Sequence, residues 1–113
     1  MKKICLPILL AASIGAAHAA DAPAEAGVSA VEALGRLNGQ ALACSETAIS
    51  AQAKQLMLKY APRTSRYGTT FEQATQLGFA DQVKSRVCPA AAALSARLDA
   101  VAEELERKLP AVQ

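Results

Sequence analysis

The sequence predicts an all-α fold, a small bundle of three helices, or of four if the first helical segment breaks near Cys44 and Ser45. Apolar residues recur three, four or seven positions apart over three stretches, which is the spacing of one helical face. No stretch alternates apolar and polar residues as a half-buried strand does. Hydrophobic residues make up 52% of the 113 residues, which provides enough apolar surface for a core and excludes an intrinsically disordered chain.

Residues 1–19 are predicted to be a cleavable signal peptide. Lys2 and Lys3 precede an apolar run that closes with the sequence Ala-His-Ala at Ala19, and small residues at these positions are what a signal peptidase requires. No apolar run in the chain reaches the roughly 20 residues that span a bilayer. We therefore expect a periplasmic protein that begins at Ala20 and has no stable membrane insertion.

Loss of the signal peptide would remove Lys2, Lys3 and His18, the only histidine. The two lysines account for the whole formal net charge of +2, so the basic character of the full chain is no evidence for nucleic-acid binding. Without histidine, and with Met57 as the only thioether after the initiator, the mature chain lacks the ligands of zinc, copper and haem sites. We expect no metal, no cofactor and no nucleic-acid partner.

Two cysteines, Cys44 and Cys88, remain after Cys5 leaves with the signal peptide. An even number of cysteines in an oxidising compartment predicts one disulfide. The two positions are 44 residues apart rather than in a Cys-x-x-Cys pair, which indicates a structural bond and not a catalytic one. On the chain-entropy model a loop of this length contributes roughly 4 kcal/mol.

Residues 20–28 show no periodicity and are predicted to be a flexible tether, followed by a single helical domain over residues 29–113. Ser29 and Glu32 have the spacing of a capping box, in which each side chain accepts a hydrogen bond from a free backbone N–H. The first helix should therefore begin directly after Ser29.

The first helix is predicted over residues 30–60, because Pro62 disfavours helical geometry in the residue before it. Gly35 and Gly39 each cost about 1 kcal/mol in a helix interior, so they indicate either close packing against a neighbour or a break. Asn38 lies beside the apolar face and is expected to be a buried, hydrogen-bonded residue.

Residues 62–68 are predicted to form a loop by composition, and Thr69 with Glu72 repeats the capping-box spacing. The second helix should therefore run from Thr69 to about Val87. Pro89 suits the first turn of a third helix, because its missing N–H has no partner to lose there. The third helix shows the clearest amphipathic stripe in the chain, formed by Leu94, Leu98, Val101, Leu105 and Leu109.

Catalytic schemes that need an imidazole are excluded by the missing histidine. Paired carboxylates could still cleave a glycosidic bond. The candidate carboxylates are Glu32, Glu46, Glu72 and Asp81. Local structure explains most of these residues, since two of them belong to capping boxes and a small bundle offers little concavity. We expect the protein not to be an enzyme.

A cationic stretch is the strongest functional candidate, because no acidic residue lies between Glu46 and Glu72 while four basic residues do. The stretch leads into the predicted start of the second helix, where free N–H groups and the helix dipole favour an anion. The candidate partner-binding residues are Lys59, Tyr60, Arg63, Arg66 and Tyr67. Alternatively, the two arginines are solvated or pair with the acidic surface of the third helix, formed by Asp99, Glu103, Glu104 and Glu106.

These features together predict a small exported, non-enzymatic helical binding module that contacts a periplasmic protein or an anionic ligand of the cell envelope through this cationic stretch. The alternative is a periplasmic chaperone or stress-response protein, which would expose apolar helix faces or oligomerise. The sequence leaves the identity of the partner and the oligomeric state open.

Overall fold

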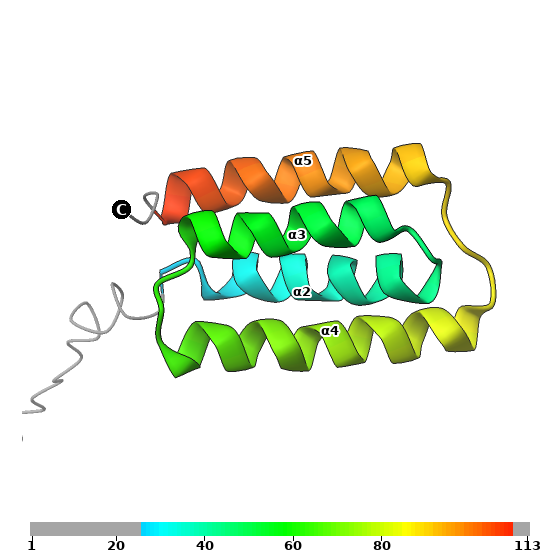
Figure 1. The fold of residues 1–113 in the computed structure, drawn as a ribbon, viewed down its shortest axis with the longest axis horizontal. Coiled ribbons are helices and arrows are strands. Elements are labelled where there is room, and N and C mark those ends of the chain that lie inside the picture. Colours follow the sequence, from blue (N-terminus) through cyan, green and yellow to red (C-terminus); the bar gives the residue numbers. More distant parts are fainter. Residues whose placement is uncertain (1–25, 110–113) are drawn as a thin grey trace, which may run out of the picture.

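Four α-helices and no strand make up the part of the chain that the computed structural model describes, residues 26–109 (Figure 1). The helices are α2 (Val28–Ala43), α3 (Thr47–Tyr60), α4 (Ser65–Ser85) and α5 (Ala91–Lys108). The predicted all-α bundle is confirmed in its four-helix form. The predicted signal peptide and most of the predicted tether lie outside the described residues. None of the four helices is long and apolar enough to cross a membrane.

The break between α2 and α3 falls at Cys44 and Ser45, as the four-helix alternative requires. Ser45 adopts a left-handed conformation with φ of 60°. The N–H of Glu46 donates to the carbonyl of Ala41 at 2.8 Å, and the N–H of Ser45 donates to the carbonyl of Leu42 at 3.2 Å. This pair of bonds is a Schellman motif, which satisfies the free carbonyls at a helix end and usually has glycine at the left-handed position.

The start of α2 differs from the predicted capping box. The helix begins at Val28, and its N-cap is Gly27 with φ of 76°, so Ser29 lies inside the helix and caps nothing. A β-carbon on Gly27 would lie 2.5 Å from Cγ of Leu109. Only glycine combines this backbone conformation with room for the leucine, and the tertiary contact therefore decides where the helix starts. Glu32 instead lies 3.9 Å from Arg36, one turn further along the helix.

The start of α4 also differs from the prediction. Thr64 is the extended N-cap and the helix begins at Ser65, so residues 65–68 are helical rather than part of a loop, and Thr69 is an exposed interior residue. Tyr67 explains the difference, because it is buried and its hydroxyl donates a hydrogen bond of 2.8 Å to the carbonyl of Ala26. Burying this side chain against the start of α2 extends the helix by four residues beyond the predicted start.

The segment that joins α4 to α5 is longer than predicted, and Pro89 lies in this segment rather than in the first turn of the third helix. α4 ends at Ser85, two residues before the predicted end at Val87, with Arg86 in a left-handed C-cap conformation of φ 63°. α5 begins two residues after Pro89. Its apolar stripe faces the core as predicted, with four buried leucines and a half-buried valine, namely Leu94, Leu98, Leu105, Leu109 and Val101.

The four helices are arranged around α2, which lies in the middle of the bundle (Figure 1). α3 and α5 pack on one side of α2 and also contact each other. α4 lies on the opposite side and packs almost entirely on α2. This arrangement leaves α4 as a wall that stands apart from α5.

Three glycines bring α2 and α4 into close contact. A β-carbon on Gly35 would lie 2.6 Å from both Cβ of Ala74 and the carbonyl oxygen of Phe71. One on Gly39 would lie 2.5 Å from the backbone nitrogen of Phe79. Gly78 of α4 meets the α2 backbone in the same way. Gly35 and Gly39 were predicted to mark either close packing or a break in the helix. Close packing is confirmed, since the helix breaks at Cys44 and Ser45 instead.

Asn38 joins three helices through its side chain and is buried, as expected. Its amide nitrogen donates to Oγ1 of Thr75 on α4 at 3.1 Å, and its amide oxygen accepts a hydrogen bond of 2.7 Å from Ser50 on α3. Within the described residues, every buried side-chain nitrogen and oxygen has a hydrogen-bond partner. The polar centre of the bundle is thus fully satisfied, which favours one specific packing of the helices.

The disulfide between Cys44 and Cys88 is present, with Cα atoms 5.8 Å apart. It joins the C-terminal end of α2 to the segment that connects α4 and α5. Because α4 packs almost entirely on α2, this bond fixes the C-terminal end of α4 relative to the rest of the bundle.

Candidate functional site

The residues of the predicted cationic surface are only partly exposed. Tyr60 and Tyr67 each have 6% of their surface accessible, so the prediction that they are exposed is wrong. Both belong to the apolar core, Tyr60 at the end of α3 and Tyr67 at the start of α4. Lys59 is exposed and lies over the ring of Tyr60, with its Nζ 5.2 Å from the ring centroid. The aromatic side chains therefore contribute packing area to the core and little contact area to a partner.

Arg63 and Arg66 lie at the surface, Arg63 in the loop after α3 and Arg66 in the first turn of α4. Arg63 lines a small hollow of about 170 Å³. The described residues show no ion pair between Arg63 and the acidic side of α5. On that helix Glu104 pairs instead with Arg107 and, at 3.9 Å, with Lys108.

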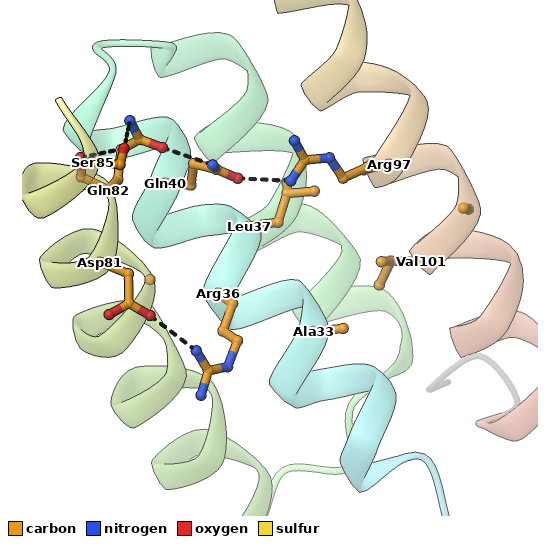
Figure 2. Close-up of a pocket in the computed structure, with 11 residues that line it drawn as sticks. Ala33, Arg36, Leu37, Gln40, Asp81, Gln82, Ser85, Arg97 and Val101 are labelled. Atoms are coloured by element: carbon orange, nitrogen blue, oxygen red, sulfur yellow. Dashed lines mark hydrogen bonds and ion pairs between the residues drawn. The ribbon is translucent and has the colours of Figure 1, made fainter. Parts of the chain in front are cut away.

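A larger hollow lies between α4 and α5, with α2 as its base, and is called the α4–α5 groove here (Figure 2). Its volume is about 580 Å³. Small or apolar residues from all three helices line part of it, namely Ala33, Leu37, Gly78, Ala100 and Val101. Polar and charged residues line the rest, namely Arg36, Gln40, Asp81, Gln82, Ser85 and Arg97.

The groove follows from how the helices pack. The glycine contacts hold α4 close to α2, while α4 and α5 have no extensive contact of their own. The alanines at Ala33 and Ala100 are too short to fill the space between the two outer helices. Along α2 the groove extends from Ala33 to Gln40, about 10 Å at the rise of an α-helix.

A chain of hydrogen bonds crosses the groove near the disulfide (Figure 2). Nη1 of Arg97 on α5 donates to Oε1 of Gln40 on α2 at 3.0 Å. Nε2 of Gln40 then donates to Oε1 of Gln82 on α4 at 2.7 Å. Each glutamine amide is held by a donor on one side and an acceptor on the other, so its orientation is determined and the bonds reinforce one another.

The chain ends at the connection between α4 and α5. Nε2 of Gln82 donates to the carbonyl of Val87 at 2.8 Å and to Oγ of Ser85 at 3.1 Å. The same nitrogen lies 3.7 Å from Sγ of Cys88. Gln82 is buried, with 6% of its surface accessible. The hydrogen-bond chain is therefore anchored on the backbone beside the disulfide, and Arg97 is the end that faces the groove.

The opposite rim carries one positive side chain that is paired with two negative ones. Nη1 of Arg36 lies 3.4 Å from Oδ2 of Asp81 on α4, and Nε of Arg36 lies 3.9 Å from Oε1 of Glu32. These pairs are exposed and each contributes at most about 1 kcal/mol. Their effect on the groove is electrostatic, because the two neighbouring carboxylates offset the positive charge of Arg36.

The carboxylate and the hydroxyl group that line the groove both have partners within the protein. Asp81 is paired with Arg36, and the hydroxyl of Ser85 donates to the carbonyl of Gln82 at 3.1 Å. In residues 26–109 no three cysteines or carboxylates gather as a metal site. Comparison of the chain with protein-family models, with curated proteins and with solved structures finds no match.

Of the polar groove residues, only Asp81 was a candidate from the sequence, as one of four possible catalytic carboxylates. The sequence does contain a signal for the base of the groove. The residues that α2 contributes are spaced so that they lie on one side of a helix, namely Ala33, Arg36, Leu37 and Gln40. Nothing local indicates that Gln82 and Arg97 face this side. Their meeting depends on the positions of α4 and α5 around α2.

Proposed function

We propose that the protein is an exported, non-enzymatic binding module whose binding site is the α4–α5 groove. The observation that carries this proposal is the groove itself, which has a volume of about 580 Å³ and combines an apolar base with a few convergent polar groups. Sites for small molecules typically have volumes of about 300–1,000 Å³ and this mixed lining. The cationic residues Lys59, Arg63 and Arg66 remain a second candidate contact, supported by their exposure but no longer by exposed tyrosines.

Export is supported by the signal-peptide pattern of residues 1–19 and by the Cys44–Cys88 disulfide, a bond that persists in oxidising compartments. Mass spectrometry of protein recovered from the periplasm of an expressing bacterium checks this part of the proposal. The expected mass is that of a chain beginning at Ala20 with both remaining cysteines oxidised. A cytoplasmic product that retains Met1 would contradict export.

The binding site can be tested with three aromatic probes of matched size: 2-naphthoate, which is anionic, 2-naphthamide, which is neutral, and 2-naphthylmethylammonium, which is cationic. Each probe is titrated into the ¹⁵N-labelled protein while amide chemical shifts are followed. Saturable shifts at Leu37, Gln82 and Val101 with any of the three probes support the groove as a binding site. Shifts confined to other surfaces, or none with all three, would contradict it.

A groove-filling variant sharpens this experiment. Ala100→Trp places a large side chain on the α5 side of the groove and should abolish probe binding. Ala92→Trp is the matched control, since Ala92 is also an exposed alanine of α5 but does not line the groove. The proposal requires that the control binds the probes like the unmodified protein.

A chaperone is a second candidate function, because large apolar side chains on α4 and in the segment directly after it are exposed. Leu77, Phe79, Val83 and Val87 have 51%, 43%, 55% and 75% of their surface accessible, respectively. Exposed apolar groups of this kind can hold an unfolded client. If this function is correct, the protein should suppress aggregation of a denatured client, Leu77→Gln/Val83→Gln should abolish the effect, and Ala100→Trp should leave it unchanged.

A further inference from the structure

Arg97 differs from the other charges that line the α4–α5 groove, because no carboxylate of residues 26–109 forms an ion pair with it. Arg36 and Asp81 offset each other on the opposite rim. Arg36 is also paired with Glu32, so Arg97 is the one positive side chain of the groove lining that has no ion-pair partner among the described residues. An anionic group placed there would gain a charge-assisted hydrogen bond, which is stronger than a bond between neutral groups.

Arg97 also has donors to spare. A guanidinium has five N–H groups, and the hydrogen bond to Gln40 uses one of the groups on Nη1. The planar fork of an arginine matches the two oxygens of a carboxylate, so two parallel hydrogen bonds can form. The side chain is exposed, and a ligand can reach it without opening the bundle.

The hydrogen-bond chain through Gln40 and Gln82 holds Arg97 before any ligand binds. Gln82 is fixed by the Val87 carbonyl, Gln40 is fixed by Gln82, and Gln40 in turn accepts the bond from Arg97. An arginine that is already oriented loses less side-chain entropy on binding than a mobile one. This positioning distinguishes Arg97 from an ordinary surface arginine such as Arg63.

The rest of the groove suits an apolar body. On α2, Leu37 lies about one turn before Gln40 and Ala33 lies one further turn away. On α5, Val101 follows Arg97 by one turn. Figure 2 shows Ala33 on α2, the base of the groove, and Val101 on α5, one of its two sides. The length of about 10 Å would take only about three residues of an extended peptide, so a small molecule fits the site better than a polypeptide segment.

We infer that the α4–α5 groove binds a small amphipathic carboxylate, with the carboxylate on Arg97 and the apolar body between Ala33, Leu37 and Val101. The inference rests on the proposed function and specifies its ligand class. Arg97 supplies recognition of the charged group. Gln40 and Gln82 are positioning residues, because they act on the ligand through Arg97.

The three naphthalene probes also test this inference. We expect 2-naphthoate to bind about tenfold more tightly than 2-naphthamide, which is the difference made by one charge-assisted hydrogen bond, and 2-naphthylmethylammonium to bind more weakly than both. Equal affinities of the carboxylate and the amide would overturn the inference while leaving groove binding, and so the proposed function, in place. Absence of groove binding by all three probes would overturn both.

Two variants identify the charge that is responsible. Arg97→Gln should remove the preference for 2-naphthoate over 2-naphthamide. Arg63→Gln is the matched control, because it also removes one exposed arginine but lies away from the groove, and it should retain the preference. A loss of preference in Arg63→Gln and not in Arg97→Gln would assign anion recognition to the cationic loop and overturn the inference.

A third variant tests positioning separately from charge. Gln40→Leu keeps Arg97 but removes the hydrogen bond that orients it. We expect the affinity for 2-naphthoate to fall several-fold. The variant should still bind 2-naphthoate more tightly than 2-naphthamide, because the charge of Arg97 remains. Circular dichroism and thermal unfolding of each variant check that the bundle is intact. Unchanged 2-naphthoate affinity in a folded Gln40→Leu variant would overturn the positioning role.

Discussion

Gly39 on α2 lies directly against the backbone of Thr75 on α4, so that a β-carbon on Gly39 would be 2.9 Å from the carbonyl carbon of Thr75 and closer still to its oxygen. Backbone atoms cannot move aside as the end of a flexible side chain can. Gly39→Ala should therefore force α4 away from α2 and lower the free energy of unfolding by about 3 kcal/mol. Urea denaturation followed by circular dichroism measures the change.

Gly68 provides the matched control for this prediction. It lies inside α4, but a β-carbon at this position would have no neighbour within 4 Å. Gly68→Ala should raise the free energy of unfolding by up to about 1 kcal/mol, because alanine restricts the unfolded chain and favours the helix. If both alanine variants change stability in the same direction, close backbone packing is not what requires glycine at position 39.

The Cys44–Cys88 disulfide should contribute stability and leave ligand binding intact in the fraction that remains folded. Its two cysteines are 44 residues apart. Closing a loop of this length lowers the entropy of the unfolded chain and so raises the free energy of unfolding by about 4 kcal/mol. Cys44→Ser/Cys88→Ser should therefore lower the melting temperature markedly. Addition of reductant should destabilise the unmodified protein and leave the variant unchanged. Two free thiols in protein from an oxidising compartment would contradict the bond.

Asn38 should be one of the most sensitive polar positions, because it joins Ser50 and Thr75 at the centre of the bundle. Asn38→Leu would leave the buried hydroxyl of Ser50 without its acceptor, and we expect a loss of about 2 kcal/mol in the free energy of unfolding. The triple variant Asn38→Leu/Ser50→Ala/Thr75→Val removes the partners as well and should recover part of this loss. A triple variant less stable than the single one would contradict this account.

Tyr67 is predicted to stabilise the fold rather than to bind a partner. Tyr67→Phe keeps the buried ring but removes the hydroxyl that donates to the carbonyl of Ala26. The free energy of unfolding should fall by about 1 kcal/mol, and the affinity for 2-naphthoate should not change. Titration of the variant alongside its denaturation curve measures both quantities. If Tyr67→Phe lost affinity for 2-naphthoate while its free energy of unfolding stayed unchanged, the result would contradict this prediction and indicate that Tyr67 binds the partner.

The helical class, the stripe of α5 and the disulfide could all be predicted from the sequence because their causes are local or combinatorial. A helix shows its buried face as a repeat of apolar residues, and two cysteines in an oxidising compartment have only each other to bond with. The break at Ser45 was one of two predicted alternatives. Its Schellman hydrogen bonds decided between them, and the left-handed residue is not the glycine that would have indicated it.

Tertiary contacts decided the helix starts and the candidate site. The capping boxes expected at Ser29 and Thr69 would each contribute about 1 kcal/mol. Packing of Leu109 over Gly27 and burial of Tyr67 outweigh them, since a fully buried large side chain contributes about 1.5–3 kcal/mol. The groove has no local cause, because Arg97 is brought to Gln40 by the packing of α5 on α2. Sequence periodicity determined the buried face of α5. It did not determine that of α4, where Leu77 and Val83 are exposed while Gly78 and Gln82 are buried. Only the arrangement of the helices around α2 decided which face of α4 is buried and which exposed residues meet.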